Sequence, residues 1–239
     1  MALKLKNLRL IESRDALDAL PDGKMMINTI NAHSYNVAQR DELFAEALQA
    51  DILIPDGQSI VWACKWLRAK SQPKERIAGW DLFTIEMAKR KAGDTIMFMG
   101  SSERVLRLIR NRASLDYPDL NIVTYSPPYK AEFTSEENDA ILSAINEAHP
   151  QLLWIGMTAP KQEKWVYENW LNLQVECHVG AIGAVFDFYA GTAKRAPEAW
   201  QRNGTEWLYR LIKEPRRMWR RYLLGNMKFL YYIGKEKLS

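Results

Sequence analysis

The sequence predicts an α/β protein with a Rossmann-like, mostly parallel β-sheet covered by helices on both faces. Three observations support this class. Short β-rich runs alternate with longer stretches of helical periodicity, the order expected of βαβ units. The β-rich runs are almost continuously apolar, which is typical of strands buried on both faces. The chain of 239 residues, 47% of them hydrophobic, is also long enough to bury the core of one large domain.

Each predicted strand is an apolar run, and a helical pattern follows it along the chain. The strands are expected over residues 24–30, 51–56, 94–100, 121–126 and 151–157. The helices are expected over residues 33–49, 57–69, 102–115, 135–148 and 160–172. Gly100 followed by Ser101 and Ser102 predicts a turn into a serine-capped helix, and Pro160 suits the first turn of the last helix.

Charge divides the chain into two parts. Residues 194–239 carry 12 Lys and Arg against 4 Asp and Glu, a net +8, whereas residues 1–193 carry 21 against 25, a net −4. We therefore expect a main α/β domain over residues 1–193 and a basic appendage over 194–239. The positive charge of the appendage favours an anionic partner: a phospholipid surface, a nucleotide phosphate or a nucleic acid.

The appendage places aromatic and apolar residues at helical spacing, with arginines between them. Pro215 is expected to break or start a helix within it. This pattern fits a helix that lies in an anionic bilayer interface, and it equally fits a helix that packs its aromatic side chains on the main domain. The residues alone leave both interpretations open.

Several classes of protein are disfavoured. Charges interrupt the apolar residues of the N-terminus, and no window approaches the roughly 20 apolar residues of a spanning helix, so we expect a cytoplasmic protein that does not cross a membrane. Cys64 and Cys177 lie far apart, which favours reduced thiols over a disulfide or a zinc site. Dinucleotide and P-loop fingerprints and metal-spaced carboxylates are missing from the sequence, so we expect chemistry without a metal or cofactor.

Small and polar residues gather at the ends of the predicted strands, where parallel sheets bind their ligands. They are Thr29, Asn31, His33, Asp56, Gly57, Gly100, Ser101, Gly156, Gly180, Gly183 and Asp187. In the stretch IPDGQSI, Asp56 either turns a corner with Gly57 or acts chemically in a cleft. The Asp-Gly pair alone does not decide between these two roles.

Six blocks occur in order between about residues 24 and 225: NTINAHSYNVAQRDELFAEALQADILIPDGQSIVWA, ERIAGWDLF, FMGSS, GMTAPKQEKWV, GAIGAVFDFYAGTAKRAP and GTEWLYRLIKEPRRMWRRY. Together they resemble the WecG/TagA/CpsF glycosyltransferases, glycosyltransferase family 26. Several blocks in register are far more specific than any single motif. Two positions depart from the usual pattern, because serines replace a second glycine after Gly100 and Ala159 stands where a proline is common.

The resemblance implies an inverting transferase that moves a sugar from a UDP-sugar to a polyprenyl-diphosphate-linked saccharide in bacterial cell-surface polysaccharide synthesis. Residues 1–193 would then bind the nucleotide sugar and carry out catalysis. Residues 194–239 would associate with the anionic inner face of the cell membrane and close the active site. The oligomeric state stays open, with a homo-oligomer among the options.

The resemblance also assigns site residues. Asp56 matches the proposed catalytic base, and Thr29 and Asn31 would position substrate hydroxyls beside it. The implied substrate-binding residues are Arg76, Gly79, Asp81, Gly100, Ser101, Gly156, Gln162, Glu163, Gly183, Asp187, Arg195, Arg210, Arg216 and Arg217. A structural role competes at two places: Asp81 could cap a helix that begins near Gly79, and Gln162 and Glu163 suit the first turn of a helix.

Two other functions remain as alternatives. One is a nucleotide-binding regulator or hydrolase that uses the same cleft without a sugar acceptor. The other is a nucleic-acid-binding module in which the aromatic residues of the basic appendage stack on bases. The acidic main domain disfavours the second alternative.

Overall fold

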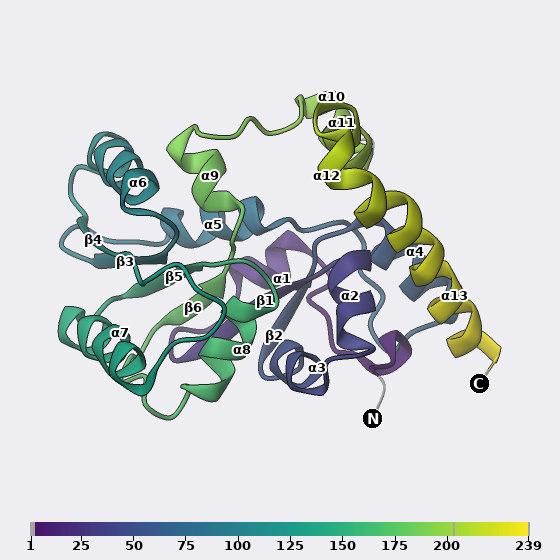
Figure 1. Cartoon of the computed structure of the whole chain (residues 1–239), viewed down its shortest axis with the longest axis horizontal. Coiled ribbons are helices and arrows are strands. Elements are labelled where there is room, and N and C mark those ends of the chain that lie inside the picture. The colour runs from purple at the N-terminus through teal and green to yellow at the C-terminus, as the bar shows by residue number, and fades with distance from the viewer. Residues whose placement is uncertain (1–2, 203, 239) are drawn as a thin grey trace.

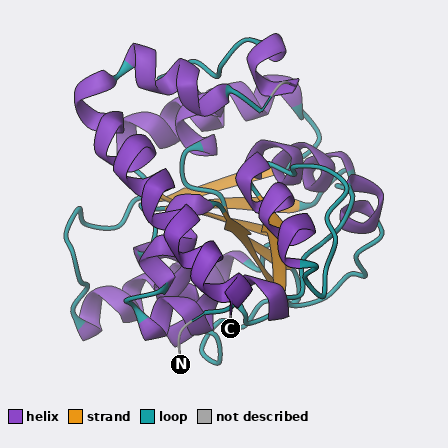
Figure 2. Cartoon of the chain, turned by 90° about the vertical axis from the view of Figure 1, so that its right-hand side faces the viewer, coloured by secondary structure: helices purple, strands orange, loops and turns teal. Residues whose placement is uncertain are grey.

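A single six-stranded sheet, with every strand parallel, organises residues 3–202 and 204–238, which are the residues that the computed structural model describes. For Arg202 and Arg217 only the backbone is described. The strand order is β2-β1-β6-β5-β3-β4, and helices lie on both sides of the sheet (Figures 1 and 2). The predicted α/β class is confirmed.

The elements of the sheet and its helices come first along the chain. They are η1 (Leu5–Asn7), α1 (Arg14–Asp18), β1 (Met25–Ile30), α2 (Ala32–Ala38), α3 (Glu42–Leu48), β2 (Ile52–Pro55), α4 (Gln58–Leu67), α5 (Gly79–Ala88), β3 (Thr95–Gly100), α6 (Glu103–Asp116), β4 (Asn121–Tyr125), α7 (Ser135–Ala148), β5 (Leu152–Gly156), α8 (Lys161–Glu168), β6 (His178–Ala181) and α9 (Val185–Ala190). The appendage follows, with α10 (Glu198–Arg202), α11 (Glu206–Lys213), α12 (Pro215–Trp219), the π-helical turn η2 (Arg220–Leu224) and α13 (Gly225–Leu238).

Alternate side chains of each strand enter two different cores. In β3, Ile96 and Phe98 pack with α1, α5, α6 and α9, whereas Met97 and Met99 pack with α7 and α8 on the other face. Successive residues of a strand point to opposite faces, so an apolar run can fill both cores. The near-continuous apolar strands of the sequence are explained by this double burial.

A third core lies beyond β2 and includes the end of the appendage. Phe229 and Ile233 of α13 are buried with residues of α2 and α4, and Figure 1 shows α13 beside these helices. The carboxylate of Glu236 accepts hydrogen bonds from the backbone N–H groups of Leu5 (2.9 Å) and Lys6 (2.6 Å) and from the Tyr35 hydroxyl (2.7 Å). The last helix is therefore held firmly against the main body.

Several elements differ from the sequence prediction, and α1 and α9 are among the helices that it did not include. The helix expected over 33–49 is divided into α2 and α3, because Asp41 accepts a hydrogen bond from the Phe44 N–H and caps a second helix. The strand β6 was not predicted, since its four residues include His178 and Gly180 and lack a long apolar run. Pro215 starts α12, as expected. Across the described residues, no helix has the length and apolar character needed to cross a membrane.

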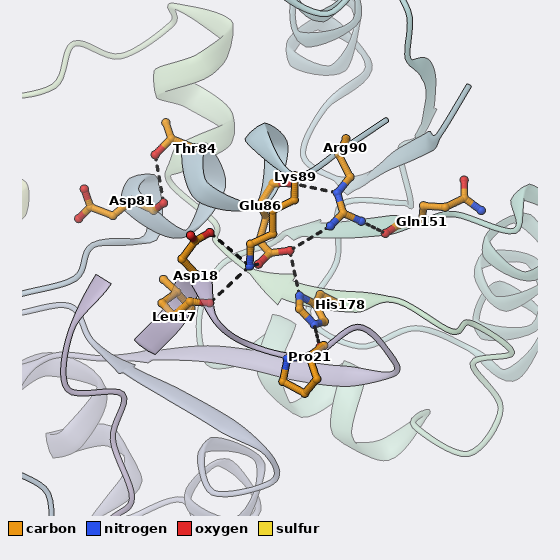
Figure 3. Close-up of polar contacts among 10 residues, drawn as sticks. All are labelled: Leu17, Asp18, Pro21, Asp81, Thr84, Glu86, Lys89, Arg90, Gln151 and His178. Atoms are coloured by element: carbon orange, nitrogen blue, oxygen red, sulfur yellow. Dashed lines mark hydrogen bonds and ion pairs between the residues drawn. The ribbon is translucent and has the colours of Figure 1, made fainter. Parts of the chain in front are cut away.

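A buried charge network fastens the amino-terminal edge of the sheet (Figure 3). The fully buried Glu86 of α5 contacts Nδ1 of His178 at 2.9 Å, Nζ of Lys89 at 2.9 Å and Nη2 of Arg90 at 3.6 Å. Nε2 of His178 lies 2.9 Å from the backbone carbonyl oxygen of Pro21. The network thus connects α5 and β6 to the loop that follows α1.

Both ring nitrogens of His178 face acceptors. An ionised carboxylate and a carbonyl oxygen can only accept hydrogen bonds, so His178 satisfies both partners only when it carries two protons. Burial disfavours the charged ring, but the hydrogen bond and charge of Glu86 outweigh it and raise the pKa of His178. The same pairing lowers the pKa of Glu86 against its own burial.

This network predicts a pH-dependent contribution to stability. Since the pKa of His178 is raised in the folded state, its contribution is complete below the ordinary histidine pKa of about 6.5 and is lost as pH rises through the folded value. Urea denaturation between pH 6 and pH 9 should show the wild type losing its advantage over His178→Gln as pH rises. An advantage that stays constant over this range would contradict the charged form of His178.

Candidate active site

Asp56 lies at the carboxyl edge of the sheet, directly after β2 and before the N-cap Gly57 of α4. The register pairs Ile30 of β1 with Pro55 of β2, so Asn31 lies beside the Asp56-Gly57 turn. A Cβ on Gly57 would meet the Asn31 Cβ at 3.3 Å. The parallel pairing of β1 and β2 therefore brings Thr29, Asn31 and Asp56 to one part of the edge, as predicted from the sequence.

Asn31 has a structural task as well. Its Oδ1 accepts hydrogen bonds from the backbone N–H groups of His33 (3.0 Å) and Ser34 (3.1 Å), and the Ser34 hydroxyl accepts one in return from the Asn31 N–H. This capping box fixes the start of α2. A substrate contact by Asn31 would have to come from its Nδ2 group.

A chain of charged groups joins Asp56 to the appendage. Nε of Arg76 lies 3.7 Å from Oδ1 of Asp56, and Nη2 of Arg76 donates a hydrogen bond of 2.8 Å to Oε2 of Glu206 in α11. Oε1 of Glu206 lies 3.2 Å from Nη2 of Arg210. Arg76 and Glu206 are mostly buried, with side chains 16% and 13% exposed. These contacts hold α11 against the loop that precedes α5.

Two further contacts place guanidinium groups on aromatic rings near these charged groups. The guanidinium of Arg195 lies 5.1 Å from the centroid of the Trp80 ring, and that of Arg210 lies 5.0 Å from the centroid of the Phe188 ring. Such cation–π contacts fix the direction of a planar guanidinium without using all its N–H donors. Arg195 and Arg210 therefore keep donors for an anionic ligand.

The environment of Asp56 makes it a weaker acid than an exposed aspartate. Burial raises its pKa to about 6, Arg76 and Arg210 oppose that shift, and Glu206 and Asp81 reinforce it. A carboxylate with such a pKa is ionised near neutral pH, and it binds a proton better than an exposed aspartate does. These are the properties of a general base.

Asp81 fulfils the structural role that the sequence left open. Its Oδ2 accepts a 2.7 Å hydrogen bond from the backbone N–H of Ala78, at the start of α5, and lies 3.3 Å from Nη2 of Arg14. Gly79 is buried, and a Cβ there would touch Val185 of α9 at 3.4 Å. Both residues shape the loop that carries Arg76.

The ends of β3 and β5 approach each other closely at two glycines. Gly100 pairs with Gly156 in the register, and Gly100 has φ +115°. A Cβ on Gly100 would lie 2.6 Å from the Gly156 carbonyl oxygen, and one on Gly156 would lie 2.5 Å from the Phe186 ring. The chain leaves β3 toward β4 and leaves β5 toward β6, on opposite sides. Such a switch point is where open α/β sheets bind ligands.

Ser101 and Ser102 have different roles at this turn: Ser101 forms the turn and Ser102 caps the helix. Ser101 has a left-handed backbone with φ 56°, its N–H donates to the Gly156 carbonyl oxygen at 2.8 Å, and its own carbonyl accepts from the Ser126 hydroxyl. Ser102 caps α6 by accepting from the Val105 N–H. The structure thus resolves which of the two serines is the cap.

Two buried polar side chains follow β5 in the first turn of α8. Nε2 of Gln162 donates a 2.9 Å hydrogen bond to Oε1 of Glu163, while Oε1 of Gln162 and Oε2 of Glu163 have no hydrogen-bond partner. Burial raises the pKa of Glu163 to about 7. A Cβ on Gly183 would lie 3.2 Å from Oε1 of Gln162. Buried acceptors without partners are expected where a ligand supplies the missing donors.

The remaining predicted residues are Asp187, Arg216 and Arg217, and none of their described contacts is with the residues around Asp56. Asp187 is exposed and accepts a 3.0 Å hydrogen bond from the Thr192 hydroxyl, which stabilises the turn after α9. Arg216 of α12 is exposed. The side chain of Arg217 lies outside the described residues. Glu206 is not among the residues predicted from the sequence, although its spacing of four residues from Arg210 is a recognisable signal for a helical ion pair.

Taken together, the fold and the edge place a half-buried carboxylate beside guanidinium groups at the carboxyl ends of parallel strands. The chain matches the model of the glycosyl transferase WecG/TagA/CpsF family over residues 2–239. It therefore belongs to that family and is a glycosyltransferase. The family suggested by the six sequence blocks is confirmed.

One named relative is similar to most of the chain. The chain is 29% identical over 215 residues to an N-acetylglucosaminyldiphosphoundecaprenol N-acetyl-beta-D-mannosaminyltransferase of Bacillus subtilis (strain 168). The match covers 89% of this chain and 80% of that relative. By its name, the relative transfers N-acetylmannosamine to a lipid-linked N-acetylglucosamine.

The close approach of β3 and β5 predicts that Gly100 tolerates no side chain. Gly100→Ala should lower the free energy of unfolding by about 1–3 kcal/mol, because the methyl group meets backbone atoms at a positive φ. Gly234→Ala is the matched control. It lies in α13 with open space around it, and it should be neutral or stabilise by up to about 1 kcal/mol. Equal stabilities of the two variants in urea denaturation would refute this explanation.

Proposed function

We propose that the protein transfers a sugar from a UDP-sugar to a polyprenyl-diphosphate-linked saccharide, with inversion at the anomeric carbon and without a metal ion. The product would serve bacterial cell-surface polysaccharide synthesis at the inner face of the membrane. The lipid-linked acceptor in the name of the Bacillus subtilis relative supports the acceptor class. That name also makes UDP-N-acetylmannosamine the first donor to test.

The position of Asp56 carries this proposal. In an inverting transfer, a base removes the proton of the acceptor hydroxyl while its oxygen attacks the anomeric carbon from the face opposite the leaving nucleotide. The new glycosidic C–O bond forms, the bond to the β-phosphate oxygen breaks, and UDP leaves with the electron pair. Asp56 is partly exposed at the strand edge, and its raised pKa suits proton acceptance.

The guanidinium groups supply the complementary charge. Negative charge grows on the β-phosphate as the donor bond breaks, and fixed cations around it lower the barrier. Arg76, Arg195 and Arg210 surround Asp56 closely enough to affect its ionisation or to be affected by it. They supply this charge from side chains of the chain itself, and planar guanidinium groups match phosphate oxygens.

An exposed apolar face of the appendage supports attachment to a membrane. Large hydrophobic side chains of η2 and α13 are exposed, among them Leu223, Leu224, Met227, Leu230, Tyr231 and Leu238. Trp62 and Trp66 extend this face onto α4, where Nζ of Lys237 donates to the Trp66 carbonyl oxygen at 2.7 Å. Lys228 and Lys235 of α13 are also exposed. Apolar side chains flanked by lysines suit the interface of an anionic bilayer.

Asp56→Asn should lower turnover by about 10²–10⁴-fold while UDP binding is retained, because the amide cannot accept the acceptor proton. In the wild type, kcat/KM should fall as pH drops below about 6, where Asp56 becomes protonated. Transfer of N-acetylmannosamine from its UDP derivative to a lipid-linked N-acetylglucosamine, followed by chromatography of the product, measures both effects.

Asp139→Asn on the exposed surface of α7 is the matched control and should keep wild-type turnover. Full turnover of Asp56→Asn would exclude Asp56 as the base. Donor hydrolysis at an equal rate without any acceptor would instead favour a hydrolase.

The exposed face should control binding to anionic membranes. The double variant Leu230→Glu with Tyr231→Glu should bind phosphatidylglycerol vesicles at least about tenfold more weakly than the wild type, since burial of one such side chain stabilises binding by up to about 1.5–3 kcal/mol. Co-sedimentation with the vesicles measures this loss.

Leu115→Glu with Tyr129→Glu is a control of the same composition, because both residues are exposed elsewhere on the body. The control should bind vesicles like the wild type. Equal weakening by both double variants would show that α13 has no special role at the membrane.

A further inference from the structure

Glu206 links the appendage to the loop that carries Arg76, the arginine beside Asp56. It is the first residue of α11, and its carboxylate accepts from a guanidinium of the body, Arg76, and pairs with one of its own helix, Arg210. With a side chain only 13% exposed, it forms these pairs largely away from water. Neither the family membership nor the named relative gives this residue a role.

Arg76 has two carboxylates within reach, and it favours one of them. Its Nη2 hydrogen-bonds to Glu206 at 2.8 Å, whereas its Nε lies 3.7 Å from Asp56, beyond ordinary hydrogen-bond distance. A guanidinium prefers to form two parallel hydrogen bonds with one carboxylate when nothing else engages it. Without Glu206, Arg76 would be free to pair closely with Asp56.

We infer that Glu206 is a positioning residue for the transfer reaction: by engaging Arg76 and Arg210 it prevents a tight Arg76–Asp56 ion pair and leaves the Asp56 oxygens available to the acceptor hydroxyl. This inference rests on the proposed function, since it assigns a task to Asp56 in that reaction. It also gives the appendage an effect on the base, because Glu206 contacts Arg76 from α11.

The charges around Asp56 determine the expected effect. The groups that face it are Arg76 from the loop before α5, Asp81 from α5, and Glu206 and Arg210 from α11, with Arg195 also coupled to it. After burial, which is the main cause of the raised pKa, Glu206 raises it and Arg76 lowers it. Removal of the Glu206 charge and a closer approach of Arg76 would both lower the pKa of Asp56 and weaken it as a base.

Glu206→Gln tests the inference with a side chain of almost the same shape. The pKa of Asp56, followed by carbon-13 NMR of its side-chain carboxyl group, should fall below its wild-type value. The acid limb of kcat/KM should move to lower pH with it. Turnover with UDP-N-acetylmannosamine and a lipid-linked N-acetylglucosamine should fall about tenfold or more, with a smaller change in KM. Glu168→Gln, an exposed carboxylate of α8, should leave all three quantities unchanged.

Glu206→Asp provides a second test in case the glutamine variant does not fold. It keeps the charge but is shorter by one methylene, so it cannot span both guanidiniums, and turnover should again fall. An unchanged Asp56 pKa in folded Glu206→Gln, or full turnover in Glu206→Asp, would overturn the positioning role. If the wild type itself transfers no sugar, the proposed function fails, whereas the NMR titration still decides whether Glu206 controls Asp56.

Discussion

The uniform direction of the strands is the constraint on which the rest of the structure depends. Because all six strands of the described sheet are parallel, their carboxyl ends lie along one edge. Residues far apart in the chain lie at or just after this edge: Asp56 follows β2, Gly100 ends β3, and Gln162 lies in the helix that follows β5. The Glu86–His178 network lies at the amino-terminal edge, so this network and the candidate site occupy opposite edges of the sheet.

Charge balance dominates the chemistry of the edge. Around Asp56, three guanidiniums of Arg76, Arg195 and Arg210 face the carboxylates of Asp56, Asp81 and Glu206, so the cluster is close to neutral before a ligand binds. In the proposed reaction, a bound nucleoside diphosphate would bring further negative charge, which would favour protonation of Asp56. The same arginines would then stabilise the leaving group, and the carboxylates would keep the arginines from neutralising the base.

The sequence predicted the α/β class, five of the strands and the polar residues at their ends, because apolar runs and strand-end glycines are local signals. It missed β6, whose four residues with His178 and Gly180 carry no such signal. One helix was predicted where the structure has α2 and α3, because the helical pattern of apolar residues continues past Asp41, the N-cap of α3. The resemblance to the family was recognised from several blocks of residues in register, and no single block was specific enough to reveal it.

The candidate site was only partly predictable for a physical reason. Asp56, Arg76 and Arg210 were selected by their positions in motifs, and the structure brings them together. Glu206 was not selected, because its importance arises from a contact with Arg76 across 130 residues, which local patterns do not encode. Asp81 shows the opposite case: a motif residue whose observed contacts are those of a helix cap and an ion pair.

Nucleotide selectivity is the measurement that we would make first. Thermal unfolding in the presence of anionic vesicles would be followed with UDP, ADP and GDP, each with and without EDTA. A ligand at about 100 times its dissociation constant adds about 2.7 kcal/mol to the free energy of unfolding. A UDP-sugar transferase that needs no metal should be stabilised by UDP alone, to the same extent with EDTA. A preference for ADP or GDP, loss of the UDP effect in EDTA, or no response to any nucleotide would contradict this function.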